Sequence, residues 1–187
     1  IAGAEDGGRA RPGEVGEILV QSPGVMQGYY RDPEAAARAL RDGWLHTGDI
    51  VRRDSQGFFF LVARKKDMIK SRGENVYPRE VEEVLLRHEA VQDTVIVGIP
   101  HQKLGEAVKA YVVLKEGRSV TQEALLSYCR NSLALFKVPT AVEFRSELPR
   151  NIVGKVLRRQ LREAEVNKMS PETLSPSRVE EEVRIGS

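Results

Sequence analysis

Three short stretches of this sequence combine residue types that could do chemistry. The first is Gly43-Trp44-Leu45-His46-Thr47-Gly48-Asp49. A carboxylate that follows a Gly-flanked turn can accept hydrogen bonds from two neighbouring hydroxyl groups, such as those of a ribose. Asp is also common as a simple turn cap. The stretch by itself leaves both interpretations of Asp49 open.

The other two stretches are basic. Residues 64–75 contain several Lys and Arg together with Gly73, and they form either a solvated linker or a functional segment at a domain boundary. Residues 148–155 end on Lys155, which follows Gly154 at the start of an expected helix. This lysine is either a functional cation or an ordinary exposed side chain.

The first stretch lies among strands and one helix. Glu17 to Gln21 has the composition of a short strand between turns, and a helix is expected from Pro33, with Asp32 as its cap and Gly43 beyond its end. Asp49 to Arg53 and Phe58 to Ala63 should pair as a hairpin. No segment up to Ala63 closes a core, so we expect this part to be the edge of a larger sheet or barrel.

The remainder alternates strands with amphipathic helices. Strands are predicted at Met68 to Ser71, Thr94 to Ile99, Ala107 to Leu114 and Ala141 to Phe144. Helices are predicted from Pro78, after Gly117 and over Val156 to Ala164. Cys129 should lie in the core. The fold class is therefore α+β: the end of a large N-terminal domain with a β-barrel-like part, followed by a small mobile domain.

Composition and length limit the ligand classes, the localisation and the domain organisation. The 187 residues have a formal charge of +2, too balanced to favour nucleic acid. A single cysteine and the lack of an apolar run of roughly 18 to 20 residues favour a cytoplasmic protein without a transmembrane segment. We expect the N-terminal domain to end at residue 65, the C-terminal domain to span 66–168, and a polar tail to follow at 169–187. The missing Met indicates that sequence lies upstream.

Taken together, the three stretches resemble the adenylate-forming superfamily of acyl-CoA synthetases, luciferases and adenylation domains. The resemblance covers about Pro12 to Ala164 and rests on the elements W-x-x-T-G-D, R-x-K-D-M-I-K-x-x-G-E-N-x-Y-P-x-E-V-E and L-P-R-N-x-x-G-K. It is strongest for fatty-acid CoA ligases of the long-chain type. Ala63 and Val153 depart from residues common in the family, but neither change removes a charge.

The resemblance implies a role for each matching residue. Asp49 and Arg64 would bind the nucleotide, and Lys66 would be the hinge about which the C-terminal domain rotates. Lys155 would bridge carboxylate and phosphate oxygens during adenylation. Three further residues would form the loop of the thioester step, with Lys70 also catalytic: Lys70, Gly73 and Asn75.

The same resemblance implies the cofactors and partners. The complete enzyme would use ATP, Mg²⁺, CoA and a carboxylic acid, and would need an N-terminal domain that supplies the phosphate loop and acyl pocket. The chain alone should be inactive and hold no cofactor or metal. An adenylation domain that loads a carrier protein and a stand-alone binding module are the alternatives. Further residues are expected to be a solvated face or a contact for CoA phosphates (Arg158, Arg159, Arg162) and packing residues (Tyr29, Tyr30, Phe58 to Phe60).

Overall fold

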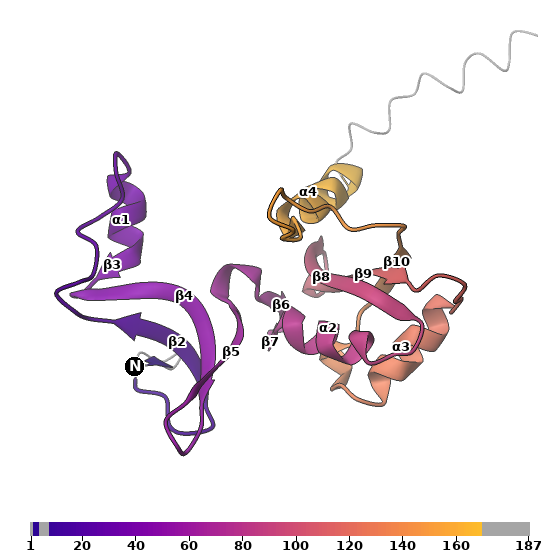
Figure 1. The fold of residues 1–187 in the computed structure, drawn as a ribbon, viewed down its shortest axis with the longest axis horizontal. Coiled ribbons are helices and arrows are strands. Elements are labelled where there is room, and N and C mark those ends of the chain that lie inside the picture. Colours follow the sequence, from indigo (N-terminus) through magenta and orange to yellow (C-terminus); the bar gives the residue numbers. More distant parts are fainter. Residues whose placement is uncertain (1, 4–7, 170–187) are drawn as a thin grey trace, which may run out of the picture.

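The computed structural model describes residues 2–3 and 8–169, which form two sheets joined by a short connection. Figure 1 shows the first sheet at the indigo end of the chain and the second sheet, with three helices around it, from the magenta segment onward. Within these residues no helix is long and apolar enough to cross a membrane. The fold class predicted from the sequence, α+β, is confirmed.

The first sheet is built around one long central strand. Its elements are β1 (Ala2–Gly3), β2 (Val15–Val20), α1 (Pro33–Ala39), β3 (Leu40–Arg41), β4 (Trp44–Arg53) and β5 (Phe59–Arg64). Strand β4 pairs antiparallel with β2, β3 and β5. The predicted cap of α1 is present, because Asp32 Oδ1 accepts a hydrogen bond from Ala35 N at 2.9 Å.

The second sheet follows a 3₁₀ turn and is flanked by helices. Its elements are η1 (Lys65–Asp67), β6 (Ile69–Ser71), β7 (Glu74–Val76), α2 (Pro78–Leu86), β8 (Val91–His101), β9 (Gly105–Leu114), α3 (Gln122–Arg130), η2 (Leu135–Lys137), β10 (Ala141–Phe144) and α4 (Arg158–Met169). Strand β9 pairs antiparallel with β8 and β6, and parallel with β10.

Both faces of the second sheet are buried. Successive side chains of β9 point to opposite faces, so Ala110 and Val112 pack toward α2 and α3, whereas Tyr111 and Val113 pack in a separate cluster that includes Leu161 of α4. Figure 1 accordingly places α4 across the sheet from α2 and α3. Cys129 lies in the first of these clusters and is fully buried, as predicted. Burial raises the pKa of its thiol to about 11.

Several sequence predictions were wrong in detail. Strand β4 begins at Trp44 rather than Asp49, strand β7 was not foreseen, and α4 begins at Arg158 rather than Val156 and extends to Met169. The predicted packing residues are instead exposed: Tyr29, Tyr30, Phe58, Phe59 and Phe60. Sequence patterns cannot show which side chains another part of the fold covers. Most of the predicted tail lies outside the described residues.

Candidate nucleotide and domain-hinge site

The turn at Thr47-Gly48-Asp49 is an irregular point within strand β4. Gly48 has a φ of +73°, in the left-handed region that favours glycine. Thr47 Oγ1 donates to Ile18 O at 2.9 Å and accepts from Asp49 N at 3.1 Å. The register of β4 with β5 also shifts between Ile50 and Val51. The side-chain hydrogen bonds of Thr47 therefore stabilise a backbone that departs from regular strand geometry.

The structure brings Asp49 and Arg64 together from neighbouring strands. They are direct partners in the β4–β5 register, and Arg64 Nε lies 2.8 Å from Asp49 Oδ1. This oxygen is buried and makes no aligned hydrogen bond within the described residues, so charge holds the pair. The Asp49 side chain is still 29% exposed. The rest of the carboxylate can thus meet a ligand while Arg64 neutralises its charge.

Glu17 of β2 supports this turn, and the sequence analysis missed it. Its Oε1 accepts from Gly48 N at 3.0 Å, and its Oε2 accepts from Lys65 Nζ at 2.8 Å. His46 Nδ1 lies 3.4 Å from the same Oε2. Burial acts to raise the pKa of Glu17, but Lys65, Gly48 and His46 outweigh it, so the pKa lies below its ordinary value. A charged residue inside an otherwise apolar strand was the available signal.

A cavity of about 780 Å³ opens beside this turn. Among the described residues that line it, Glu17 is the one acidic residue, and the basic residues are Arg38, Arg41, Arg64, Lys65 and Lys66. An excess of fixed cations around a hollow of this size favours a ligand that carries several negative charges. Groups of three or more metal-ligating side chains do not occur in the part of the chain that the structure describes.

The predicted hinge residue lies on the connection between the two sheets. Lys66 is exposed in η1, which separates β5 from β6. Its neighbour Lys65 is tied to Glu17 of the first sheet. Since Lys66 also lines a second cavity on the side of α4, it borders both parts of the chain.

The predicted thioester-step residues form a hairpin rather than a loop. Lys70 and Asn75 are direct partners in the β6–β7 register. The turn between them has Arg72 at φ +57° and Gly73 at φ +82°. Two consecutive residues with positive φ define a tight hairpin turn, in which glycine is strongly favoured at the second position. Lys70 is exposed and Asn75 is half-buried.

Lys155 lies in a different, closely braced loop. Asn151 Oδ1 accepts from Val153 N at 3.1 Å and from Lys155 N at 2.8 Å, and Gly154 has a φ of +80°. Arg150 pairs with Asp93 of β8, which anchors the loop to the second sheet. The Lys155 side chain is exposed and lines neither cavity. The structure therefore groups Asp49 with Arg64 and groups Lys70 with Asn75, but leaves Lys155 apart from both pairs.

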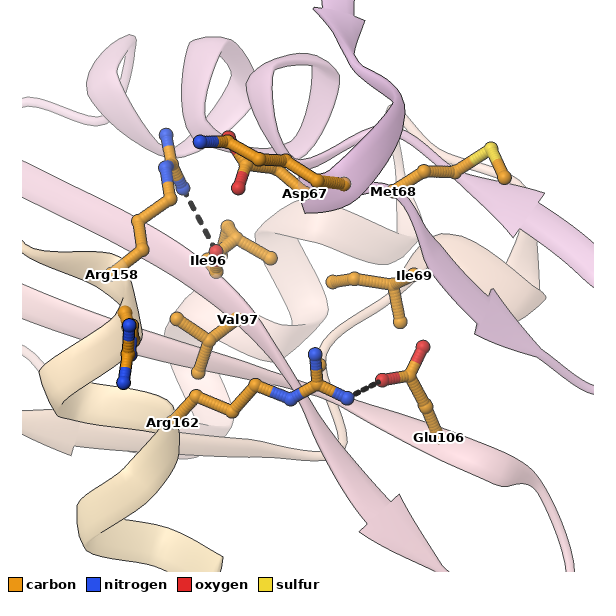
Figure 2. A pocket seen from close by; sticks show the side chains of 11 residues that line it. Asp67, Met68, Ile69, Ile96, Val97, Glu106, Arg158 and Arg162 are labelled. Carbon is orange, nitrogen blue, oxygen red and sulfur yellow. Dashed lines mark hydrogen bonds and ion pairs between the residues drawn. The ribbon is translucent and has the colours of Figure 1, made fainter. Parts of the chain in front are cut away.

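The second cavity, of about 240 Å³, is lined in part by the three arginines of α4 (Figure 2). Arg158 donates to Ile96 O at 2.9 Å and pairs with Glu82 of α2. Arg162 pairs with Glu106 at 2.6 Å, and Arg159 pairs with Glu163. Each guanidinium thus has a carboxylate partner within the protein. The predicted basic face is thus partly solvated, since the Arg159 and Arg162 side chains are half or more exposed, and its cations are also paired within the protein.

Comparison with known proteins gives the class to which these features belong. The family described as AMP-binding enzyme C-terminal domain matches residues 80–155. This match over residues 80–155 confirms the resemblance drawn from the sequence.

Several curated relatives of this chain are CoA ligases. Long-chain-fatty-acid–CoA ligase of Bacillus subtilis (strain 168) is 53% identical over 165 residues, which are 88% of this chain and 30% of that protein. 2-Succinylbenzoate–CoA ligase of Geobacillus kaustophilus is 47% identical and covers 84% of this chain and 32% of its own length. The chain thus spans about 30% of the length of the curated relatives it matches.

Solved structures agree with this placement. ATP-bound MatB from Rhodopseudomonas palustris superposes with a TM-score of 0.81 at 36% identity, covering 88% of this chain and 33% of that one. The o-succinylbenzoate CoA synthetase of Bacillus subtilis, in complex with its acyl-adenylate intermediate, gives a TM-score of 0.75 at 40% identity, covering 86% and 33%.

Proposed function

We propose that this chain is the C-terminal part of an ATP-dependent acyl-CoA ligase. The complete enzyme would join a carboxylic acid to CoA through an acyl-adenylate, with release of pyrophosphate and then AMP. The observation that carries the proposal is the Asp49–Arg64 pair beside a cationic cavity. Long-chain fatty acids are the preferred acid class, because the most similar curated ligases include several of that name at 49 to 53% identity.

In this proposal Asp49 and Arg64 bind the nucleotide. The exposed part of the Asp49 carboxylate accepts hydrogen bonds from the ribose hydroxyls, and Arg64 holds this carboxylate in position through their ion pair. The cations that line the cavity lie beside the turn and attract the phosphates. Mg²⁺ would arrive with the ATP phosphates, and we assign it to no residue of this chain.

Two further groups of residues would act in turn. Lys155, exposed on its braced loop, would neutralise the charge that develops around the α-phosphorus during adenylation. Rotation about Lys66 would then bring the β6–β7 hairpin, with Lys70, Gly73 and Asn75, to the adenylate for thioester formation. The domain division at residues 65–66 follows from this role of the connection.

The test uses a chimeric ligase in which this chain replaces the matching 165-residue segment of the Bacillus subtilis enzyme. Lys155→Ala should slow adenylation about 10²- to 10³-fold, because it removes one donor aimed at transition-state charge. Thioester formation from supplied acyl-adenylate should persist. Lys66→Pro should have the opposite effect, because a fixed φ near −65° restricts rotation. Single-turnover kinetics of each half-reaction would measure both effects.

Two controls distinguish a wrong ligase function from wrong roles of Lys66 and Lys155. The unmutated chimera must form acyl-CoA from a panel of fatty and aromatic acids, and the 187-residue chain alone should release no pyrophosphate above a blank. An inactive, folded chimera would count against the ligase. Equal slowing of both steps by both substitutions would count against the roles of Lys66 and Lys155.

A further inference from the structure

The β6–β7 hairpin is joined to the second sheet by a very short ladder. In the described residues, β6 pairs with β9 at the single position Ser71–Gly105. Arg72 N adds one hydrogen bond to Leu104 O at 2.9 Å. Ile69 and Val76 pack the hairpin into the core, but the backbone N–H of Lys70 lies beyond this short ladder and requires another acceptor.

Glu106 supplies that acceptor through its side chain. Its Oε2 accepts from the backbone N–H of Lys70 at 2.9 Å, and its Oε1 accepts from Arg162 Nη2 at 2.6 Å. Figure 2 shows Glu106 and Arg162 facing one another along the cavity. The Glu106 side chain is only 20% exposed, so both charge-assisted bonds are partly shielded from water.

Gly98 of β8 makes room for this carboxylate. A Cβ at Gly98 would lie 3.0 Å from Glu106 Oε1 and 3.0 Å from Ile69 Cγ2, tighter than most real Cβ contacts. The backbone of Gly98 is not in the left-handed region, so its conformation does not require glycine. The absence of a side chain at Gly98 instead leaves space for the Glu106 carboxylate next to Ile69 of β6.

We propose that Glu106 is a positioning residue for the second half-reaction, a role that rests on the ligase function proposed above. One carboxylate fixes the strand that carries Lys70 and ties it to α4 through Arg162. The rotated domain would then present a hairpin of defined position to the adenylate and the thiol. Loss of this contact lets the hairpin shift, and a displacement of about 1 Å can cost up to about 100-fold in rate.

The adenylation step should be largely independent of Glu106. The Lys155 loop is anchored separately by Arg150 and Asp93. Helix α4 keeps its contacts through Arg158 with Glu82 and through Glu165 with Lys109. Removal of Glu106 therefore affects the hairpin more than the loop that carries Lys155.

The experiment compares three substitutions with matched controls. Glu106→Ala removes both contacts, and Glu106→Gln preserves the side-chain size but can satisfy only one of its two donors, because an amide presents one oxygen. Gly98→Ala crowds Glu106 and its neighbour Ile69 without changing either residue. The first control, Glu163→Gln, removes an exposed carboxylate partner of Arg159 on the same helix. The second control is Gly24→Ala, because a Cβ at Gly24 would lie 3.8 Å from Ser22 Oγ, an ordinary contact distance.

Two readouts decide the outcome. In the chimeric ligase, thioester formation from supplied acyl-adenylate should fall roughly 10- to 100-fold for Glu106→Ala and Gly98→Ala, less for Glu106→Gln, while adenylation changes by no more than about threefold. In the 187-residue chain, hydrogen exchange of the Lys70 amide should accelerate about tenfold or more in Glu106→Ala. The two control variants should leave both quantities near their original values.

The two readouts also separate the proposals. Equal slowing of both half-reactions, or a Lys70 amide that exchanges alike in Glu106→Ala and Glu163→Gln, would overturn the positioning role. If the unmutated chimera shows no ligase activity, the ligase function fails. The exchange measurement then still decides whether Glu106 fixes the hairpin.

Discussion

The two sheets of this chain differ in how much apolar surface each covers by itself. In the first sheet, the buried hydrophobic residues are Ile50, Val51 and Ala63, and all others in the described residues lie from Ile69 onward. Phe59, Phe60 and Leu61 of β5 are each about half exposed. Because consecutive residues of a strand point to opposite faces, both faces of β5 are uncovered.

The two sheets therefore hold their functional residues in different ways. The second sheet has helices on both faces and can act as a rigid body that carries Lys70 and Lys155. The first sheet holds Asp49 and Arg64 by local hydrogen bonds and an ion pair rather than by a deep core. We infer that the uncovered faces of the first sheet pack against the remainder of the proposed ligase.

The largest expected effect appears when the two regions are separated. Residues 66–169 expressed alone should unfold in one cooperative transition, because they retain both core clusters. Residues 8–64 alone should show no cooperative transition. Circular dichroism during urea titration would measure both. A cooperative transition in residues 8–64 would contradict the view that this sheet lacks a sufficient core.

Core substitutions should show the same contrast within the intact chain. Leu125→Ala removes a side chain with no exposure and should lower the free energy of unfolding of the second region by about 2–5 kcal/mol. Phe59→Ala, at 47% exposure, should change the stability of the chain by no more than about 0.5 kcal/mol. Denaturant unfolding followed by circular dichroism measures both changes. Similar losses for the two variants would remove the contrast.

A smaller effect concerns acid stability of the second region. Burial acts to raise the pKa of Glu165, but Lys109, Lys168 and Tyr111 outweigh it and lower the pKa from 4.5 to about 2. Its contribution to stability is therefore complete above pH 4.5 and is lost as the pH falls toward 2. Glu165→Gln should reduce stability at neutral pH and weaken its dependence on pH between these values. Unfolding midpoints measured from pH 7 to pH 2 would test this.

Glu165 is not the sole source of the acid dependence in the described residues, so its substitution needs a control on the same helix. Glu143 shares Lys109 and also has a lowered pKa, so part of the acid dependence will remain in the variant. Glu163→Gln, which alters an exposed pair on the same helix, should leave the profile unchanged. Parallel profiles for Glu165→Gln and the unmodified chain would contradict the assignment.

The smallest effects come from the helix caps, one in each region. Thr121 Oγ1 caps α3 through Ala124 N at 3.1 Å, as Asp32 caps α1. Replacement of either by Ala should cost about 1 kcal/mol locally. Trp44, the single tryptophan, reports on the first sheet. Thr121→Ala should lower the midpoint of the cooperative transition followed by circular dichroism, whereas Asp32→Ala should alter only the Trp44 fluorescence and leave this midpoint unchanged. Equal midpoint shifts for the two variants would indicate one cooperative unit.

The sequence by itself determined the local elements and the class of chemistry. Pro33 and Asp32 specify the start of α1, and Asp54 to Gly57 specify the hairpin turn, because capping and turn geometry depend on adjacent residues. The apolar period marked the face of α3 that contains Leu125 and Cys129. The spacing of three motifs was sufficient for the resemblance to adenylate-forming enzymes, which the comparisons confirm. The individual site roles stay predictions.

Tertiary structure alone decided which distant groups meet. Glu17 contacts Gly48 and Lys65 across 31 and 48 positions of sequence, and Arg162 reaches Glu106 across 56. None of these three contacts has a local sequence period, because each depends on how strands pair and on which helix covers them. The exposure of Phe59 and Phe60 was likewise undetermined, since an aromatic strand has the same pattern whether or not another surface covers it. Burial and ion pairing are properties of the assembled layers, and the free energy that fixes them comes from surfaces far apart in the chain.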